Sequence, residues 1–280
     1  MMDIQKIIKS IAGLKPIPHV VNKIMAITRD PDSSMAQLSE VISYDAMATA
    51  NLLKAANSAY YGCAKKFDSI HQAIVFLGMD EVVDLVLLTS SAENLKRSQQ
   101  GYGLTAGALW RYSVASALLA RKLAVTKNIA DIHLVFTAAL LKDIGKVVLQ
   151  QYVADGYEKI KALVGKGNCS FREAEKAVLG IDHAELGALV ARVWQFSPIM
   201  IDIIGNHHCP GQAVLAKAQT GIVHAGDVLC MMMGVNDGLD GLAYRFDQDT
   251  IESLGMTDVD LQTIIAGFAE ELQKVEELIS

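Results

Sequence analysis

Apolar side chains along the chain recur mainly at spacings of three and four residues. The segments "VVNKIMAIT", "MAQLSEVIS" and "AMATANLLKAA" show this spacing, whereas strict alternation over the length of a strand is hard to find. Spacings of three and four place apolar side chains on one face of an α-helix. The pattern therefore predicts an all-α protein.

Helix-boundary signals agree with that prediction. Three pairs of residues have the spacing of a helix N-cap and the residue that bonds back to it: Ser34 and Gln37, Ser170 and Glu173, and Asp182 and Glu185. We expect helices at residues 3–12, 18–29, 34–43, 45–56, 69–77, 79–97, 105–126, 130–144, 152–166, 171–179, 183–195, 198–208, 212–234 and 257–279.

The clearest interruption between long apolar helices is "NLKRSQQGYGLTAG", residues 94–107, which is polar and contains three glycines. Glycine-rich polar stretches of this kind mark loops between elements. We therefore predict an N-terminal helical lobe over residues 1–97, packed on a second helical lobe over residues 105–280. The candidate catalytic and metal-binding residues described below fall in the second lobe.

Composition restricts the class of protein. The chain has 280 residues, of which 51% are hydrophobic and 20% charged, as in a compact soluble protein. Its net charge of -6 argues against general nucleic-acid binding, which depends on clustered Lys and Arg. The apolar runs are too short to span a bilayer, and no signal-peptide core is found. We expect a cytoplasmic protein without a membrane partner. Its four cysteines lie far apart, which predicts reduced thiols.

Candidate chemistry begins with an aspartate and a histidine. Asp143 follows the apolar run "FTAALL", so its carboxylate is expected to be buried and to need a partner. His183 follows the predicted N-cap Asp182, and the positive end of a helix favours a neutral imidazole ring. A neutral ring can donate a lone pair to a metal ion.

Further histidines follow in "PIMIDIIGNHHCP" and "IVHAGDVL". Neighbouring helical residues differ by about 100° around the axis, so His207 and His208 can reach one site only at a terminal turn. His224 and Asp227 are expected to share a helix face. Imidazole and carboxylate are ligands that iron, manganese and zinc accept. A single buried histidine is more often a hydrogen-bonded core residue, and that alternative stays open for each one.

At this point the chain resembles a known family. "LLKDIGKVVL" is similar to the "LLHDIGK" segment of the HD phosphohydrolase superfamily. Residues 14–27, 43–62 and 69–87, together with "LWRYSVASALLARKLA", "DHAELGALVARVW" and "NHHCP", resemble the HDOD domain, a bacterial relative of the HD-GYP proteins. The resemblance implies one HDOD unit over about residues 14–230, an HD-like bundle in the second lobe, and an additional C-terminal helix.

The resemblance also implies a set of metal ligands. Asp143, His183, His207, His208 and Asp227 match ligand positions of the HD-GYP-like proteins, as a remnant metal site. Two positions depart from the pattern, because Tyr112 and Lys142 stand where ligand histidines are expected. A lysine ammonium would repel a cation and would instead neutralise Asp143 or Asp227.

These departures favour a regulatory HDOD module of bacterial signal transduction that has a degenerate site and no catalysis. Its expected partners are other signalling proteins and a nucleotide-type ligand, and its oligomeric state is left open. An alternative is a phosphohydrolase of HD type that uses one iron, manganese or zinc ion held by Asp143, His183, His207 and His208. A third reading is a scaffold in which the polar residues only hydrogen-bond.

Overall fold

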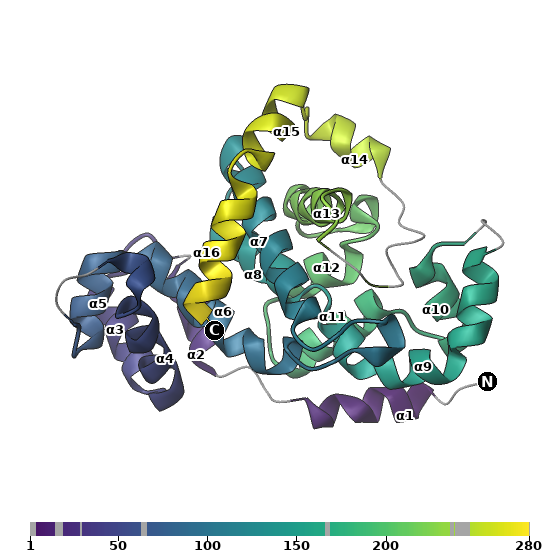
Figure 1. The fold of residues 1–280 in the computed structure, drawn as a ribbon, viewed down its shortest axis with the longest axis horizontal. Helices are drawn as coiled ribbons and strands as arrows, with labels where there is room; N and C mark the ends of the chain where they lie inside the picture. The colour runs from purple at the N-terminus through teal and green to yellow at the C-terminus, as the bar shows by residue number, and fades with distance from the viewer. Residues whose placement is uncertain are drawn as a thin grey trace. The chain divides into compact units, whose positions relative to one another are not determined.

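The structure is a computed structural model that describes residues 4–14, 19–28, 30–62, 66–165, 169–235, 238 and 247–279 (Figure 1). The regular structure of these residues consists of α-helices and short 3-10 helices. No β-strand occurs in the described part of the chain, and a single isolated bridge joins residues 99 and 104. The prediction of an all-α fold is confirmed.

The chain divides into two compact units, residues 16–92 with 265–280 and residues 1–15 with 93–264. The division into lobes at 1–97 and 105–280 stays a prediction. In the structure, residues 1–15 belong to the same compact unit as 93–264, and residues 265–280 to the same unit as 16–92. Within the first unit, Ile24, Leu38, Leu52 and Ile74 form part of the core. Its described helices are α2 (His19–Ile27), α3 (Met35–Ser43), α4 (Ala46–Ala56), η2 (Ala59–Tyr61), α5 (Ile70–Leu77), most of α6 (Met79–Leu95), and α16 (Phe268–Ile279).

The second unit holds all the candidate ligands. Its described helices are α1 (Ile4–Lys9), η1 (Ser10–Gly13), η3 (Gln100–Tyr102), α7 (Ala108–Thr126), α8 (Ile132–Leu141), α9 (Ile144–Gly165), α10 (Phe171–Leu179), α11 (His183–Val193), α12 (Pro198–Asn206), η4 (Pro210–Gln212), α13 (Lys217–Met232), α14 (Gln248–Ser253) and α15 (Asp258–Ile265).

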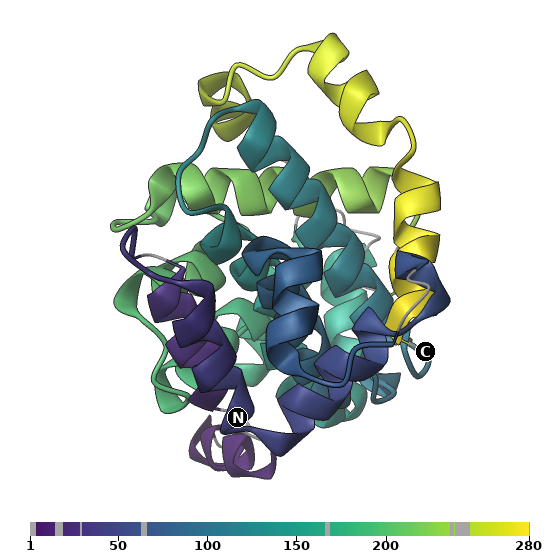
Figure 2. The same cartoon turned by 90° about the vertical axis from the view of Figure 1, so that its left-hand side faces the viewer.

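Helices α7, α8 and α13 pack against one another at the centre of this unit (Figures 1 and 2). Their side chains are apolar on almost every side; Leu119, Phe136 and Val223 are fully buried. A helix that is apolar all round belongs in a core rather than at a surface. The few polar side chains on these helices are therefore held in a low-dielectric interior.

The three capping pairs are confirmed, each as a reciprocal capping box at the start of α3, α10 or α11. Three helix predictions were wrong, and one of them is the helix expected at 212–234, which begins only at Lys217. The helix expected at 152–166 begins at Ile144, and Gly145 lies in its first turn, packed against the backbone of His183 and Gly187. The helix expected at 257–279 is broken into α15 and α16 at Gly267, whose φ of 73° lies in the left-handed region that favours glycine. The six-residue helix α14 was not predicted.

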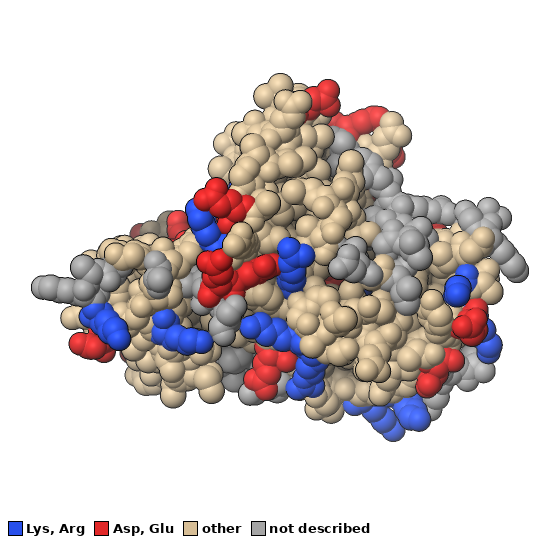
Figure 3. Space-filling model, viewed as in Figure 1, with Lys and Arg blue, Asp and Glu red and all other residues tan. Residues whose placement is uncertain are grey.

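Two surface properties bear on partners. Among the residues that the structure describes, no helix combines enough length with enough apolar character to cross a membrane. On the face drawn in Figure 3, Lys and Arg side chains are interspersed with Asp and Glu.

Candidate functional site

A buried set of ionisable side chains lies inside the unit of residues 1–15 and 93–264, and we call it the polar cluster. Its members come from several helices and from the turns between them. All but the half-buried His208 are almost completely shielded from solvent. Its members are Tyr112 on α7, Lys142 and Asp143 between α8 and α9, Lys146 on α9, Glu175 on α10, His183 on α11, His207 and His208 after α12, and Asp227 on α13.

Gly145 sets the distance between two sides of the cluster. A Cβ atom added at this position would lie 2.0 Å from the carbonyl oxygen of His183 and 2.8 Å from the backbone nitrogen of Gly187. Only glycine therefore allows the first turn of α9 to contact the first turn of α11 backbone to backbone. This contact brings Asp143 close to His183.

Lys142 joins the two aspartates of the cluster. Its Nζ atom lies 2.5 Å from Oδ2 of Asp143 and 2.8 Å from Oδ1 of Asp227, and its side chain is fully buried. Tyr112 donates a 2.7 Å hydrogen bond to Oδ1 of Asp227, and its ring lies 4.5 Å from the ammonium. Burial alone would lower the pKa of Lys142, but Asp143 and Asp227 raise it above its ordinary value. The group is therefore a charged ammonium.

Asp143 has a second cationic partner that the sequence reasoning missed. Nζ of Lys146, one helical turn further along, lies 2.8 Å from Oδ1 of Asp143. Burial alone would raise the pKa of Asp143, but Lys142 and Lys146 hold it well below its ordinary value. The carboxylate is thus ionised, and each of its oxygens accepts from an ammonium group.

His183 is oriented by Glu175, which the sequence reasoning also missed. The Nδ1 atom of His183 lies 2.6 Å from Oε2 of Glu175, and the backbone nitrogen of His183 donates to the same oxygen at 3.1 Å. The other oxygen of Glu175 accepts a hydrogen bond from Tyr102. Burial alone would lower the pKa of His183, but Glu175 raises it above its ordinary value. The carboxylate of Glu175 therefore opposes the neutralising effect expected of the helix end, and the neutral state of this ring stays a prediction.

His207 and His208 do meet at the turn that ends α12, as their spacing predicted. His207 donates from Nδ1 to the carbonyl oxygen of Ile204 at 2.7 Å, and its buried Nε2 has no hydrogen-bond partner. The Nε2 atoms of His183 and His208 lie 2.8 Å apart. Burial holds the pKa values of His207 and His208 well below the ordinary value, so both rings are neutral.

The three imidazoles fit one metal ion. Their ligand nitrogens lie within 4.8 Å of one another, and Oδ1 of Asp143 lies 3.8 Å from Nε2 of His183. The outer nitrogens of His183 and His207 are held by a carboxylate and a carbonyl, as is usual for metal-binding histidines. The unpartnered Nε2 of His207 is directly explained by such an ion. A set of imidazoles with one carboxylate suits iron, manganese or zinc.

The residues around Asp227 do not fit a second ion. Lys142 lies between Asp143 and Asp227, so a positive charge already lies where a cation would need both carboxylates. Tyr112 offers a hydroxyl that is donated to Asp227, and burial raises its pKa well above the ordinary value. His224, also in this region, donates to the backbone carbonyl of His207 and accepts from the backbone of Asp247. It supports the turn rather than joining the imidazoles.

These features define an all-helical protein with a buried histidine and aspartate centre. A model of the HDOD domain matches residues 14–210, so the chain belongs to the HDOD family. Among curated proteins, an uncharacterised protein of Treponema pallidum (strain Nichols) is 26% identical over 208 residues. The match covers 72% of this chain, and the chain spans about 40% of the length of that relative.

Solved structures show the same fold. An HDOD domain protein of unknown function from Geobacter sulfurreducens has a TM-score of 0.73 and 23% identity over 99% of both chains. A candidate signal transduction protein from Marinobacter aquaeolei VT8 has a TM-score of 0.73 and 19% identity, covering 95% of this chain and 59% of its own. A candidate phosphohydrolase from Shewanella amazonensis SB2B has a TM-score of 0.64 and 22% identity over 97% and 94% of the two chains.

Proposed function

We propose that this HDOD protein is a regulatory module of signal transduction whose HD centre performs no hydrolysis. The proposal is carried by the position of Lys142, whose ammonium pairs with both Asp143 and Asp227. An amine attached to the chain cannot leave as a solvated ion does. The two carboxylates are therefore held as structural anions.

The chemistry of phosphoester cleavage gives the reason. Two-metal centres cleave phosphoesters by stabilising the attacking and the leaving oxygen at the same time. With Tyr112 and Lys142 at positions where the resemblance implies two imidazoles, the described residues around Asp143 offer donors that suit one ion and not two. The same proposal places the protein in the bacterial cytoplasm. It gives the protein other signalling proteins and a nucleotide-type ligand as partners. The name of the Marinobacter protein, a candidate signal transduction protein, is in keeping with it.

A second candidate function is a phosphohydrolase that uses one ion. It is favoured by the unpartnered Nε2 of His207, which faces the nitrogens of His183 and His208. Asp143 would become the fourth ligand when its Oδ1 exchanged the contact with Lys146 for the ion. An ion bound there would lower the pKa of a bound water and make it a nucleophile. Glu175 would keep His183 oriented, and Lys142 would keep Asp143 ionised.

One pair of measurements separates these functions. Protein purified without chelator is analysed for manganese, iron and zinc, and is assayed on cyclic dinucleotides and nucleotides with and without added Mn²⁺. The regulatory proposal expects no turnover above that of His207→Ala and Asp143→Ala. Turnover that is abolished by chelator and by either substitution would overturn it in favour of the hydrolase. Less than about a tenth of an equivalent of metal, with none taken up on addition, would count against any ion at the imidazoles and favour the scaffold reading.

A further inference from the structure

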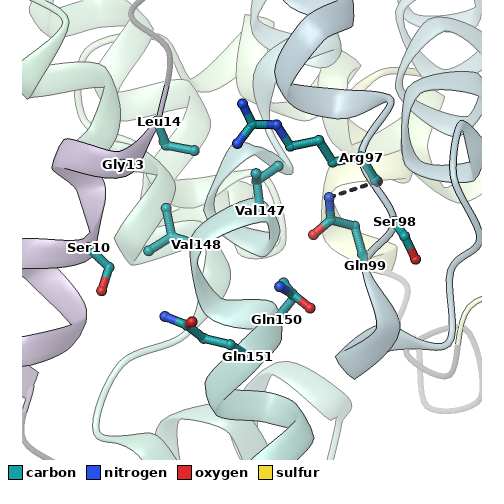
Figure 4. Close-up of a pocket in the computed structure, with 10 residues that line it drawn as sticks. All are labelled: Ser10, Gly13, Leu14, Arg97, Ser98, Gln99, Val147, Val148, Gln150 and Gln151. Carbon is teal, nitrogen blue, oxygen red and sulfur yellow. Dashed lines mark hydrogen bonds between the residues drawn. The ribbon is translucent and has the colours of Figure 1, made fainter.

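A hollow of about 370 Å³ lies in the same compact unit but is lined by none of the polar cluster. Its walls come from the α1–η1 segment, from α9 and from the residues just before η3 (Figure 4). The volume falls within the range of small-molecule pockets, about 300–1,000 Å³. The proposed regulatory function does not account for it.

The walls combine one cation, several amides and an apolar patch. Arg97 is exposed and has no carboxylate partner among the residues that the structure describes. In Figure 4 its guanidinium extends toward Leu14, above Val147, while the side chains of Gln150 and Gln151 lie on the opposite side. A guanidinium binds phosphate in a two-pronged geometry. Glutamine amides pair with the edges of nucleobases: with adenine, the amide oxygen accepts from the N6 amine and the amide nitrogen donates to N7.

Gln99 provides the observation that points to a ligand. The residue is fully buried, its Nε2 donates to the carbonyl oxygen of Arg97 at 3.0 Å, and its Oε1 has no hydrogen-bond partner. Rotating the amide by 180° would place two oxygens against each other, so the orientation is fixed. Buried acceptors in native proteins almost always have a donor. A ligand group that reaches Gln99 at this end of the hollow would supply the missing donor.

The wall that carries Gln99 is preformed. The backbone nitrogen of Gln99 donates to the carbonyl oxygen of Leu104 at 2.9 Å, and the carbonyl oxygen of Gln99 accepts from the backbone nitrogen of Leu104 at 3.1 Å. Gly101 holds this turn against α9, since an added Cβ would lie 1.9 Å from the carbonyl oxygen of Gln150. A preformed wall lowers the entropic cost of binding.

We propose that this hollow binds a purine nucleoside monophosphate with an exocyclic amine, represented by AMP. The phosphate pairs with Arg97, the purine ring lies on Leu14 and Val147, and the amine donates to Oε1 of Gln99. The amides of Gln150 and Gln151 pair with the remaining edge of the base. Inosine monophosphate, which has a carbonyl oxygen in place of the amine, would place an acceptor against an acceptor.

The hollow lies next to a segment that reaches the polar cluster. Tyr102, at the end of η3, donates its backbone N–H to the carbonyl of Gln99 and its hydroxyl to Glu175, the partner of His183. An AMP site here would identify the nucleotide-type ligand of the regulatory proposal, on which its signalling role rests, and its binding does not depend on a metal ion. AMP would then be a small-molecule signal to which the proposed regulatory module responds.

Calorimetric titration in the presence of EDTA tests the site without any contribution from bound metal. AMP is expected to bind at least ten times more tightly than inosine monophosphate, and inorganic phosphate alone more weakly than either. Arg97→Gln is expected to weaken AMP binding at least tenfold. Gln99→Met is expected to abolish the preference for AMP over inosine monophosphate. The matched control Lys176→Gln, a surface cation outside the hollow, should bind AMP as the unmodified protein does.

Methyl NMR locates the ligand independently of any variant. The signals of Leu14, Val147 and Val148 should shift on AMP addition, and His207→Ala should bind AMP unchanged. Absence of AMP binding at millimolar concentration, equal binding of both nucleotides, or binding that is lost in His207→Ala would each overturn the proposal. Hydrolytic turnover would contradict the regulatory function but not this site, because the titration is done without metal.

Discussion

The two halves of the polar cluster differ in how fully their groups are satisfied. In the ammonium half, Lys142 and Lys146 contact Asp143 and Asp227 at 2.5 to 2.8 Å, so both carboxylates have cationic partners. In the imidazole half, His207 has a buried nitrogen with no partner. Both halves lie in the same core. Among the described residues of the cluster, the imidazole half has a buried nitrogen that could accept a further partner.

The ammonium half carries its positive charge on the chain, whereas the imidazole half has a buried nitrogen that no described group satisfies. Lys142 satisfies its carboxylates permanently, and their position no longer depends on any ion. The imidazoles are neutral at His207 and His208 and keep lone pairs available. The predictions below test this difference.

The largest effect is expected from Lys142→Met. Two carboxylates would lose their shared partner inside the core, and breaking a buried ion pair costs about 3–5 kcal/mol. Urea unfolding should show this loss in the free energy of unfolding. The control Lys176→Met removes a half-exposed partner of Glu185, where a loss below about 1 kcal/mol is expected. Similar losses in both variants would show that the ammonium half is not tightly coupled.

A smaller effect is expected when a metal ion is added to the imidazole half. Mn²⁺ or Zn²⁺ at 100 times its dissociation constant should raise the free energy of unfolding by about 2.7 kcal/mol. His207→Ala should lose most of this gain. His224→Ala is the matched control, because His224 is equally buried and both of its ring nitrogens bond to backbone atoms, those of His207 and Asp247. An equal gain in all three proteins would place the ion elsewhere.

Glu175→Gln should weaken metal binding about 10–100-fold, the usual effect of losing a group that orients a ligand histidine. The carboxylate at 2.6 Å from Nδ1 of His183 would be replaced by a neutral amide. Titration with Zn²⁺ against a competing chelator measures the change. Glu158→Gln, on the exposed face of α9, is the control and should leave the affinity unaltered.

The smallest effect is expected from pH in metal-free protein. Because the pKa of His183 is raised on folding, its contribution to stability is complete below about pH 6.5 and is lost as pH rises through the folded-state value. The slope cannot exceed about 1.4 kcal/mol per pH unit. Glu175→Gln removes the group that raises this pKa, so the decline should become shallower. Asp143, with its pKa lowered, keeps its charge over this range. Equal slopes in both proteins would contradict the role given to Glu175.

Much of the site was accessible from the sequence because its ligands stand beside helix ends and apolar runs. Asp143, His183, His207 and His208 do come together, and Lys142, expected to neutralise Asp143 or Asp227, contacts both. Whether they hold a metal ion stays a prediction.

The missed residues show where sequence patterns are ambiguous. Glu175 belongs to "FREAEKAVL", where several charges surround it, and only its place in the apolar stripe with Phe171 and Leu179 marks it as buried. Lys146 likewise lies between apolar neighbours. A spacing rule identifies the buried face but not which distant group makes a buried charge stable. That depends on contacts such as Glu175 with His183, eight residues apart.

The backbone contact at Gly145 has a consequence for how such a centre changes during evolution. Because the first turns of α9 and α11 meet through main-chain atoms, the spacing of positions 142, 143 and 183 does not rely on the side chains found there. Ligands can be exchanged one at a time while the architecture persists. A single substitution at position 142, 143 or 183 is therefore expected to change the charge of the polar cluster without moving α9 relative to α11, provided that the glycine is kept.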